Sequence, residues 1–155
     1  MSELIYDFQN KAYLTGRSRR AGNMDAEAAS NIQASDDDED MNQALRSIQN
    51  AYSQLLVELS EAIVKDGGTT SSNKLISSGS NITISLSLPS NYAMGLRDAL
   101  TSSIHDYIIN KALTDWFLIT NPNEAETYST LAANSLKNLH ETFNRRERPV
   151  RTNPA

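Results

Sequence analysis

The sequence predicts a mainly α-helical fold with three long-to-medium helices, a short N-terminal helix and a small β-ribbon inserted between the first two long helices. Three observations lead to this prediction. Two long stretches place apolar residues at three- and four-residue steps, the spacing of a buried helix face. A third follows a proline-containing helix-start signal. One short segment instead alternates apolar and polar residues, as a half-buried strand does.

The N-terminal residues predict a short helix followed by a basic arm. Over residues 2–14 the apolar side chains recur at helical spacing, and Ser2 suits the N-cap position. Two glycines in residues 15–22 are expected to break this helix. The same segment carries Arg17, Arg19 and Arg20. We therefore expect it to form an exposed, positively charged loop or arm.

Residues 23–40 predict a linker, because they contain few large apolar side chains. They end in a run of acidic residues, which are Asp36, Asp37, Asp38, Glu39 and Asp40. Like charges at this density repel one another in a compact structure. The same carboxylates precede a strong helical pattern, where they also favour the positive end of the helix dipole and supply an N-cap.

The most regular pattern in the chain predicts the first long helix. Its apolar stripe runs from Met41 to Ile63, which is about six helical turns. Gly67 and Gly68 follow and can adopt the left-handed conformation that closes a helix. We therefore expect this helix to end near Lys65.

The next segment predicts the β-ribbon, at about residues 74–88. Its second strand alternates polar side chains with Ile82, Ile84, Leu86 and Leu88. Leu75 and Ile76 are the expected antiparallel partner across a turn at residues 77–81. A two-stranded ribbon is marginal by itself in water. It therefore either packs on the helices or is completed by another chain.

The second and third long helices are predicted to form an antiparallel pair. An apolar stripe over residues 92–119 predicts the second. Asn121, Pro122 and Glu124 then form a start signal, with Asn as the N-cap and Pro at the first helical position. The third stripe continues to Phe143, and the short connection implies antiparallel packing.

These patterns divide the chain into three parts. Residues 1–40 hold the N-terminal helix, the basic arm and the acidic linker, and residues 41–144 form the helical domain with the ribbon. Residues 145–155 form a basic tail, because Pro149 ends the third helix. The tail contains Arg145, Arg146, Arg148 and Arg151.

Composition excludes several kinds of site. The 155 residues include no cysteine, which excludes disulfides, thiol nucleophiles and cysteine-ligated zinc. His105 and His140 are the only histidines, and neither completes the His-Glu-x-x-His spacing of a helical zinc site. The acidic run lacks the glycine and the ligand spacing of an EF-hand loop. We therefore expect no enzyme activity, no metal and no cofactor.

The net charge and the hydropathy of the sequence limit where the protein is expected to be located and what it is expected to bind. No stretch is apolar over the roughly 18 residues that a membrane span requires, so we expect no membrane partner. The lack of cysteine removes the usual evidence for secretion, so we expect a cytoplasmic origin. The formal net charge of −5 speaks against a general nucleic-acid coat.

The two arginine clusters are the features that folding explains least. Guanidinium groups pair equally well with carboxylates and phosphates, so they fit either an acidic protein surface or a nucleic-acid backbone. A solvated surface is a third alternative. Neither interleaved aromatic residues nor a helix-turn-helix accompany them. The candidate partner-binding residues are these arginines together with Leu75, Ile76, Ile82, Ile84 and Leu86 of the ribbon.

The order of elements resembles the small head–tail connector, or neck ring, proteins of tailed bacteriophages. Four stretches are similar to structural proteins of phages that infect Bacteroides-type gut bacteria. They are residues 112–117, residues 120–125, Tyr128 and residues 146–151. The resemblance covers roughly residues 41–151.

The resemblance implies a non-enzymatic adaptor in the virion neck, made in the bacterial host cytoplasm. It implies a ring of the protein's own copies, commonly twelve, beneath the portal, with DNA passing through the lumen without sequence-specific binding. The ribbon and both basic segments would then bind neighbouring portal, neck or tail proteins. The acidic run would meet a neighbour's arginines or face the channel. The alternative hypothesis is a small cytoplasmic nucleic-acid-binding or regulatory protein that uses its arginine clusters.

Overall fold

The computed structural model describes residues 1–22, 24–35, 37–64, 77 and 79–149. Within this part the chain forms five α-helices and one 3₁₀-helix, so the mainly helical class is confirmed. The elements are α1 (Ser2–Ala21), α2 (Ala26–Ile32), α3 (Asp38–Glu58), η1 (Met94–Leu96), α4 (Arg97–Thr120) and α5 (Pro122–Phe143).

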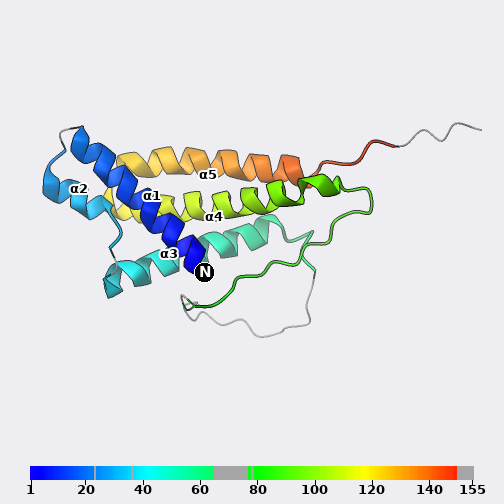
Figure 1. The fold of residues 1–155 in the computed structure, drawn as a ribbon, viewed down its shortest axis with the longest axis horizontal. Helices are drawn as coiled ribbons and strands as arrows, with labels where there is room; N and C mark the ends of the chain where they lie inside the picture. Colours follow the sequence, from blue (N-terminus) through cyan, green and yellow to red (C-terminus); the bar gives the residue numbers. More distant parts are fainter. Residues whose placement is uncertain (23, 36, 65–76, 78, 150–155) are drawn as a thin grey trace, which may run out of the picture.

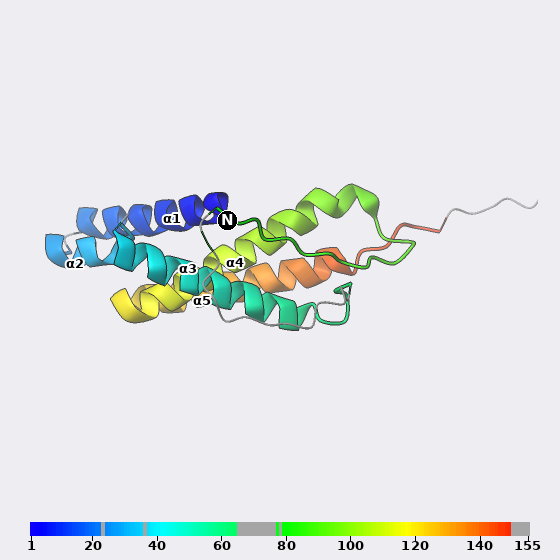
Figure 2. The same cartoon turned by 90° about the horizontal axis from the view of Figure 1, so that it is seen from below.

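The helices α3, α4 and α5 lie along the long axis of the molecule, and α1 crosses them obliquely (Figure 1). α1 contacts α2, α3 and α4, while α4 packs against both α3 and α5. The short helix α2 lies at one end of the bundle, and the C-terminal tail leaves from the other end (Figures 1 and 2). The short helix and the tail therefore mark opposite ends of the bundle.

The α4–α5 hairpin forms as predicted. Asn121 is the N-cap of α5, its side chain accepts a hydrogen bond from the Asn123 backbone N at 3.2 Å, and Pro122 is the first helical residue. Proline at this position has no N–H to leave unpaired and is pre-set for a helix. The short connection therefore returns the chain antiparallel to α4.

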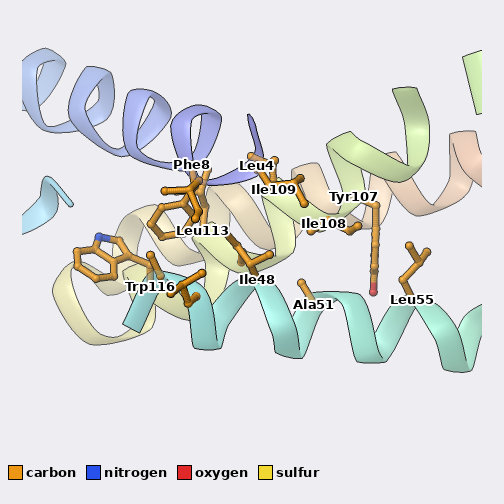
Figure 3. Close-up of a cluster of buried hydrophobic side chains, with 14 of the residues drawn as sticks. Leu4, Phe8, Ile48, Ala51, Leu55, Tyr107, Ile108, Ile109, Leu113 and Trp116 are labelled. Carbon is orange, nitrogen blue, oxygen red and sulfur yellow. The ribbon is translucent and has the colours of Figure 1, made fainter. Parts of the chain in front are cut away.

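One buried apolar cluster draws side chains from all five α-helices. In Figure 3, Phe8 of α1 and Ile48 of α3 point toward Ile109 and Leu113 of α4. Phe8 also meets Trp116 edge to face, with ring centroids 5.8 Å apart. This arrangement suits the quadrupoles of the two rings. The N-terminal helix is thus part of the core.

The prediction of a basic loop or arm at residues 15–22 was wrong, because α1 continues to Ala21. Gly16 does not end the helix but lets α2 approach it. A Cβ atom at this position would lie 2.7 Å from Gln33 Cγ and 2.8 Å from the Ala29 carbonyl oxygen. Glycine is used here for the close approach of two segments.

The prediction of a linker over residues 23–40 was also wrong where α2 forms. Ile32 is only 1% exposed, and its carbonyl oxygen accepts a hydrogen bond from Trp116 Nε1 at 3.0 Å. A seven-residue helix is unstable by itself. Packing of Ile32 and its hydrogen bond with Trp116 supply the stability that its sequence lacks.

The two long helices have different bounds from those predicted. α3 begins at Asp38 within the acidic run and ends at Glu58, well before Lys65. After it, the chain turns through residues 59–62. Before α4, a 3₁₀-helix replaces the predicted start near residue 92, and the Tyr92 side chain is instead buried.

The predicted β-ribbon is not seen. No β-strand forms in the described residues, and Leu75 and Ile76 of the expected partner strand lie outside them. The second segment keeps its predicted alternation, with Ile82, Ile84 and Leu86 half-buried. It runs extended along the bundle (Figure 2) and bonds to residues 62–64 through one isolated bridge between Ile63 and Leu86.

Candidate interaction surfaces

All three arginines of the N-terminal cluster are exposed, and one of them also pairs with a buried carboxylate. Arg19 Nε donates a hydrogen bond to Glu124 Oε1 at the start of α5, and Glu124 is only 5% exposed. This hydrogen bond and the charge of Glu124 raise the pKa of the Arg19 guanidinium. Arg17 and Arg20 are exposed. The main role of Arg19 is therefore structural, because it pairs with a buried carboxylate.

The C-terminal arginines lie on a tail whose direction is fixed by main-chain hydrogen bonds. The Ala93 N donates to the Arg145 carbonyl oxygen at 3.4 Å, and the Glu147 N donates to the Asn91 carbonyl oxygen at 2.8 Å. Arg146 Nη1 donates to the Phe143 carbonyl oxygen at 2.9 Å, near the end of α5. The side chains of Arg145, Arg146 and Arg148 are exposed, and Arg151 lies outside the described residues.

The two clusters are not brought together. Arg19 lies beside the first turn of α5, whereas Arg145 follows its last turn. The 22 residues of α5 span about 33 Å. The arginines therefore form two separate sites and not one continuous basic face.

The acidic run forms the start of α3. Asp37 is the N-cap residue, and Asp38, Glu39 and Asp40 occupy the first turn, where negative charge favours the helix dipole. Ser35 Oγ donates hydrogen bonds to Asp37 Oδ2 at 3.0 Å and to Asp40 Oδ2 at 2.7 Å. The carboxylates thus shape the turn into α3, and Asp36 lies outside the described residues.

The apolar candidates of the second ribbon segment face their own bundle, whereas Leu75 and Ile76 lie outside the described residues. Ile82, Ile84 and Leu86 line a hollow of about 370 Å³ together with Leu100 and Ile104 of α4. Within the single chain, these three side chains pack against the helical core. They are therefore partly used within the chain.

Both histidines connect helices. His105 Nε2 of α4 lies 2.8 Å from Asp7 Oδ2 of α1, and His140 Nε2 of α5 lies 3.8 Å from Glu58 Oε2 of α3. Each pair is at least partly exposed to solvent. They are surface contacts between helices, and exposed ion pairs of this kind, formed when the histidine is protonated, typically contribute up to about 1 kcal/mol each.

One surface was missed by the sequence patterns. Tyr13 and Ile119 follow the apolar stripes of their helices, but they are 48% and 70% exposed. Tyr6 on α1 is 67% exposed. Each lines one or both of two hollows that also contact Ala34 and Ser35, just after α2. The seven-residue spacing of Tyr6 and Tyr13, on one side of α1, was the available signal.

Two further findings concern the described residues alone. They contain no group of three or more His, Asp or Glu side chains placed to hold a metal ion. None of their helices combines the length and the apolar character that crossing a bilayer demands.

Comparisons with models of protein families, with curated proteins and with solved structures give no match for this chain.

Proposed function

We propose that the protein is a structural adaptor of a phage virion neck. Its copies assemble as a ring, twelve-fold, beneath the portal and join the capsid to the tail, with DNA passing through the ring. Its partners are its own copies, the portal protein and other neck or tail proteins. The proposal includes no enzyme activity, no cofactor and no membrane.

The observation that carries this proposal is the basic tail. It leaves the end of a long helical bundle (Figure 1) and is held by main-chain hydrogen bonds. Its residues Arg145 and Arg148 are exposed. Neither side chain forms a contact with another described residue that would stabilise the bundle. Arginine side chains placed in this way suit a carboxylate-bearing partner.

Exposed apolar side chains at the opposite end support an assembling protein. Leu118 and Ile119 are 61% and 70% exposed at the end of α4. Exposed apolar residues that lie next to one another mark interaction sites more often than isolated ones do. An adaptor that contacts neighbours at both ends would cover them.

The alternative, a small nucleic-acid-binding protein, is less well supported. Arg19 is engaged by Glu124, and the two arginine clusters lie at opposite ends of α5. Nucleic-acid binding relies on several phosphate contacts along one face. The separation of the clusters therefore favours protein partners.

The mass of the purified full-length protein, measured by light scattering alone and with candidate portal rings at low and high salt, tests the proposal. We expect a ring-sized species, or assembly that depends on the portal. A monomer that ignores the portal and binds DNA with an affinity that falls steeply with salt would support the nucleic-acid alternative instead.

A further inference from the structure

Two neighbouring hollows form a groove on the surface at the α2 end of the molecule. The larger, of about 700 Å³, is lined by residues that include Tyr13, Asp37, Asp40 and Ile119. The smaller, of about 470 Å³, extends along α1 to Tyr6. Both are lined by Tyr13, Ala34 and Ser35. We call this continuous surface the tyrosine groove.

The tyrosine groove exposes large aromatic and aliphatic side chains, which a monomeric protein would be expected to bury. Tyr6, Tyr13 and Ile119 are 67%, 48% and 70% exposed. Tyrosine and large aliphatic side chains typically become the buried centre of an interface. The groove therefore has the composition of a binding surface.

The chemistry of the groove fits an extended segment that contains arginine and proline. Tyrosine rings attract guanidinium groups through their faces and also accept proline rings. Asp37 and Asp40 at the side of the groove add carboxylates, which pair with arginine forks. The two carboxylates accept hydrogen bonds from Ser35 and retain further acceptor positions.

The protein itself contains such a segment. Residues 145–149 read Arg-Arg-Glu-Arg-Pro and run extended beyond α5, with all five residues exposed. Their charge is opposite to that of the acidic turn at the groove. The tail therefore complements the groove in charge and in side-chain type.

The tail cannot reach the groove of its own molecule. Ile119 lies next to the start of α5, and the tail begins after its end, about 33 Å away along the helix. Arg148 is five residues beyond Phe143, a distance of at most about 17 Å in a fully extended chain. Any contact between them must therefore join two copies.

We propose that the tail of one copy binds in the tyrosine groove of the next, with Arg145 and Arg148 near Asp37 and Asp40 and the apolar stems against Tyr13 and Ile119. A contact between two different surfaces is heterologous, and it closes a ring when the rotation between copies allows it. This inference rests on the proposed ring function, for which it names the two contacting surfaces.

Two variants with opposite defects test the contact in the full-length protein. R145A/R148A removes two of the tail's positive charges and leaves the groove intact. Ile119→Lys places a positive charge in the groove and leaves the tail intact. Val57→Lys is the matched control, because Val57 is 73% exposed on α3 and lines neither hollow.

Sedimentation velocity gives the outcome. We expect the wild type and Val57→Lys to assemble, and each of the other two variants to remain monomeric. Mixed in equal amounts, the two defective variants should form a heterodimer and stop there, because only one intact tail can meet one intact groove. Assembly of both variants at wild-type level overturns the inference and leaves the ring function standing.

A labelled peptide of residues 144–155 separates the contact from ring formation. We expect it to bind the wild type, with affinity reduced roughly tenfold or more by Ile119→Lys and unchanged by Val57→Lys. If the wild type is monomeric yet binds the peptide in this pattern, the contact holds and the ring function fails. Failure to bind the protein, or binding to duplex DNA in its place, overturns the inference.

Discussion

The α4–α5 hairpin and the N-terminal pair α1–α2 are held in the fold by different means. The hairpin buries apolar residues along its length, for example Leu113 and Leu139, which are both fully buried. The N-terminal pair depends more on a few specific contacts, at Gly16, Trp116 and Arg19. Stability spread over many contacts resists single substitutions, whereas stability concentrated in a few does not. We expect the N-terminal pair to open first.

The largest expected effect is that of Trp116→Ala, which removes the side chain that joins the two regions. Trp116 belongs to the hairpin, packs against Phe8 and bonds to the Ile32 carbonyl oxygen. The substitution should lower the free energy of unfolding by about 3–5 kcal/mol, measured by circular dichroism in urea. Trp116→Phe, which keeps an aromatic ring but no N–H donor, should cost less. Equal losses would show that ring packing contributes little.

Gly16→Ala should open the N-terminal pair and leave the hairpin closed. The new methyl group would meet Gln33 and the Ala29 backbone, at a cost of about 1–3 kcal/mol for an overpacked contact. Hydrogen exchange should rise in α2 and stay unchanged in α5. Gly22→Ala is the control, because its Cβ meets nothing nearer than 3.4 Å. Faster exchange throughout the molecule would contradict the comparison.

Asn121→Ala tests the hairpin at its turn. The substitution removes the hydrogen bond to the Asn123 N and should cost about 1 kcal/mol, as loss of an N-cap typically does. Urea denaturation should show one transition at a lower midpoint. Asn123→Ala, at an exposed position, should be nearly neutral. A loss confined to α1 and α2 in hydrogen exchange would contradict the idea that the hairpin unfolds as one unit.

The smallest expected effect is that of a change at Asp115, a half-buried residue of α4. Burial raises the pKa of the Asp115 carboxyl, and Lys111 opposes part of this shift. The folded state therefore binds the proton more tightly than the unfolded chain does. The carboxyl's contribution to stability is greatest in acid, and it is lost as the pH rises from about 3.9 through the folded-state pKa.

Asp115→Asn removes this dependence. It should stabilise the protein at pH 7 relative to the wild type by up to about 0.5 kcal/mol, and the difference should shrink in acid. Urea denaturation at both pH values measures it, with Asp106→Asn at an exposed site of the same helix as the control. A difference that grows in acid would contradict the assigned direction of the pKa shift.

Apolar periodicity and capping predicted the three long helices, because both signals are local. The same signals failed at the N-terminus. Gly16 resembles a helix breaker until its neighbour Ala29 is known, and Ile32 is too isolated in the sequence to suggest a buried helix. Tertiary contacts decided both positions, as they often do where local preference is weak.

The candidate surfaces were predicted only in part. The exposed C-terminal arginines follow from the basic composition and from Pro149. The pairing of Arg19 with Glu124 joins residues far apart in the chain, which no local pattern reveals. Tyr13 and Ile119 fit the helical stripes yet face outward, because a stripe wider than the neighbouring helices can cover leaves its edges exposed.

The attachment of the tail to residues 91–93 has a consequence for how the protein can change over evolution. The hydrogen bonds between Asn91 and Glu147 and between Ala93 and Arg145 use main-chain atoms only. Such bonds place little restriction on the identity of the side chains. Substitutions in the tail can therefore alter which surface it recognises while its direction is inherited unchanged from the bundle.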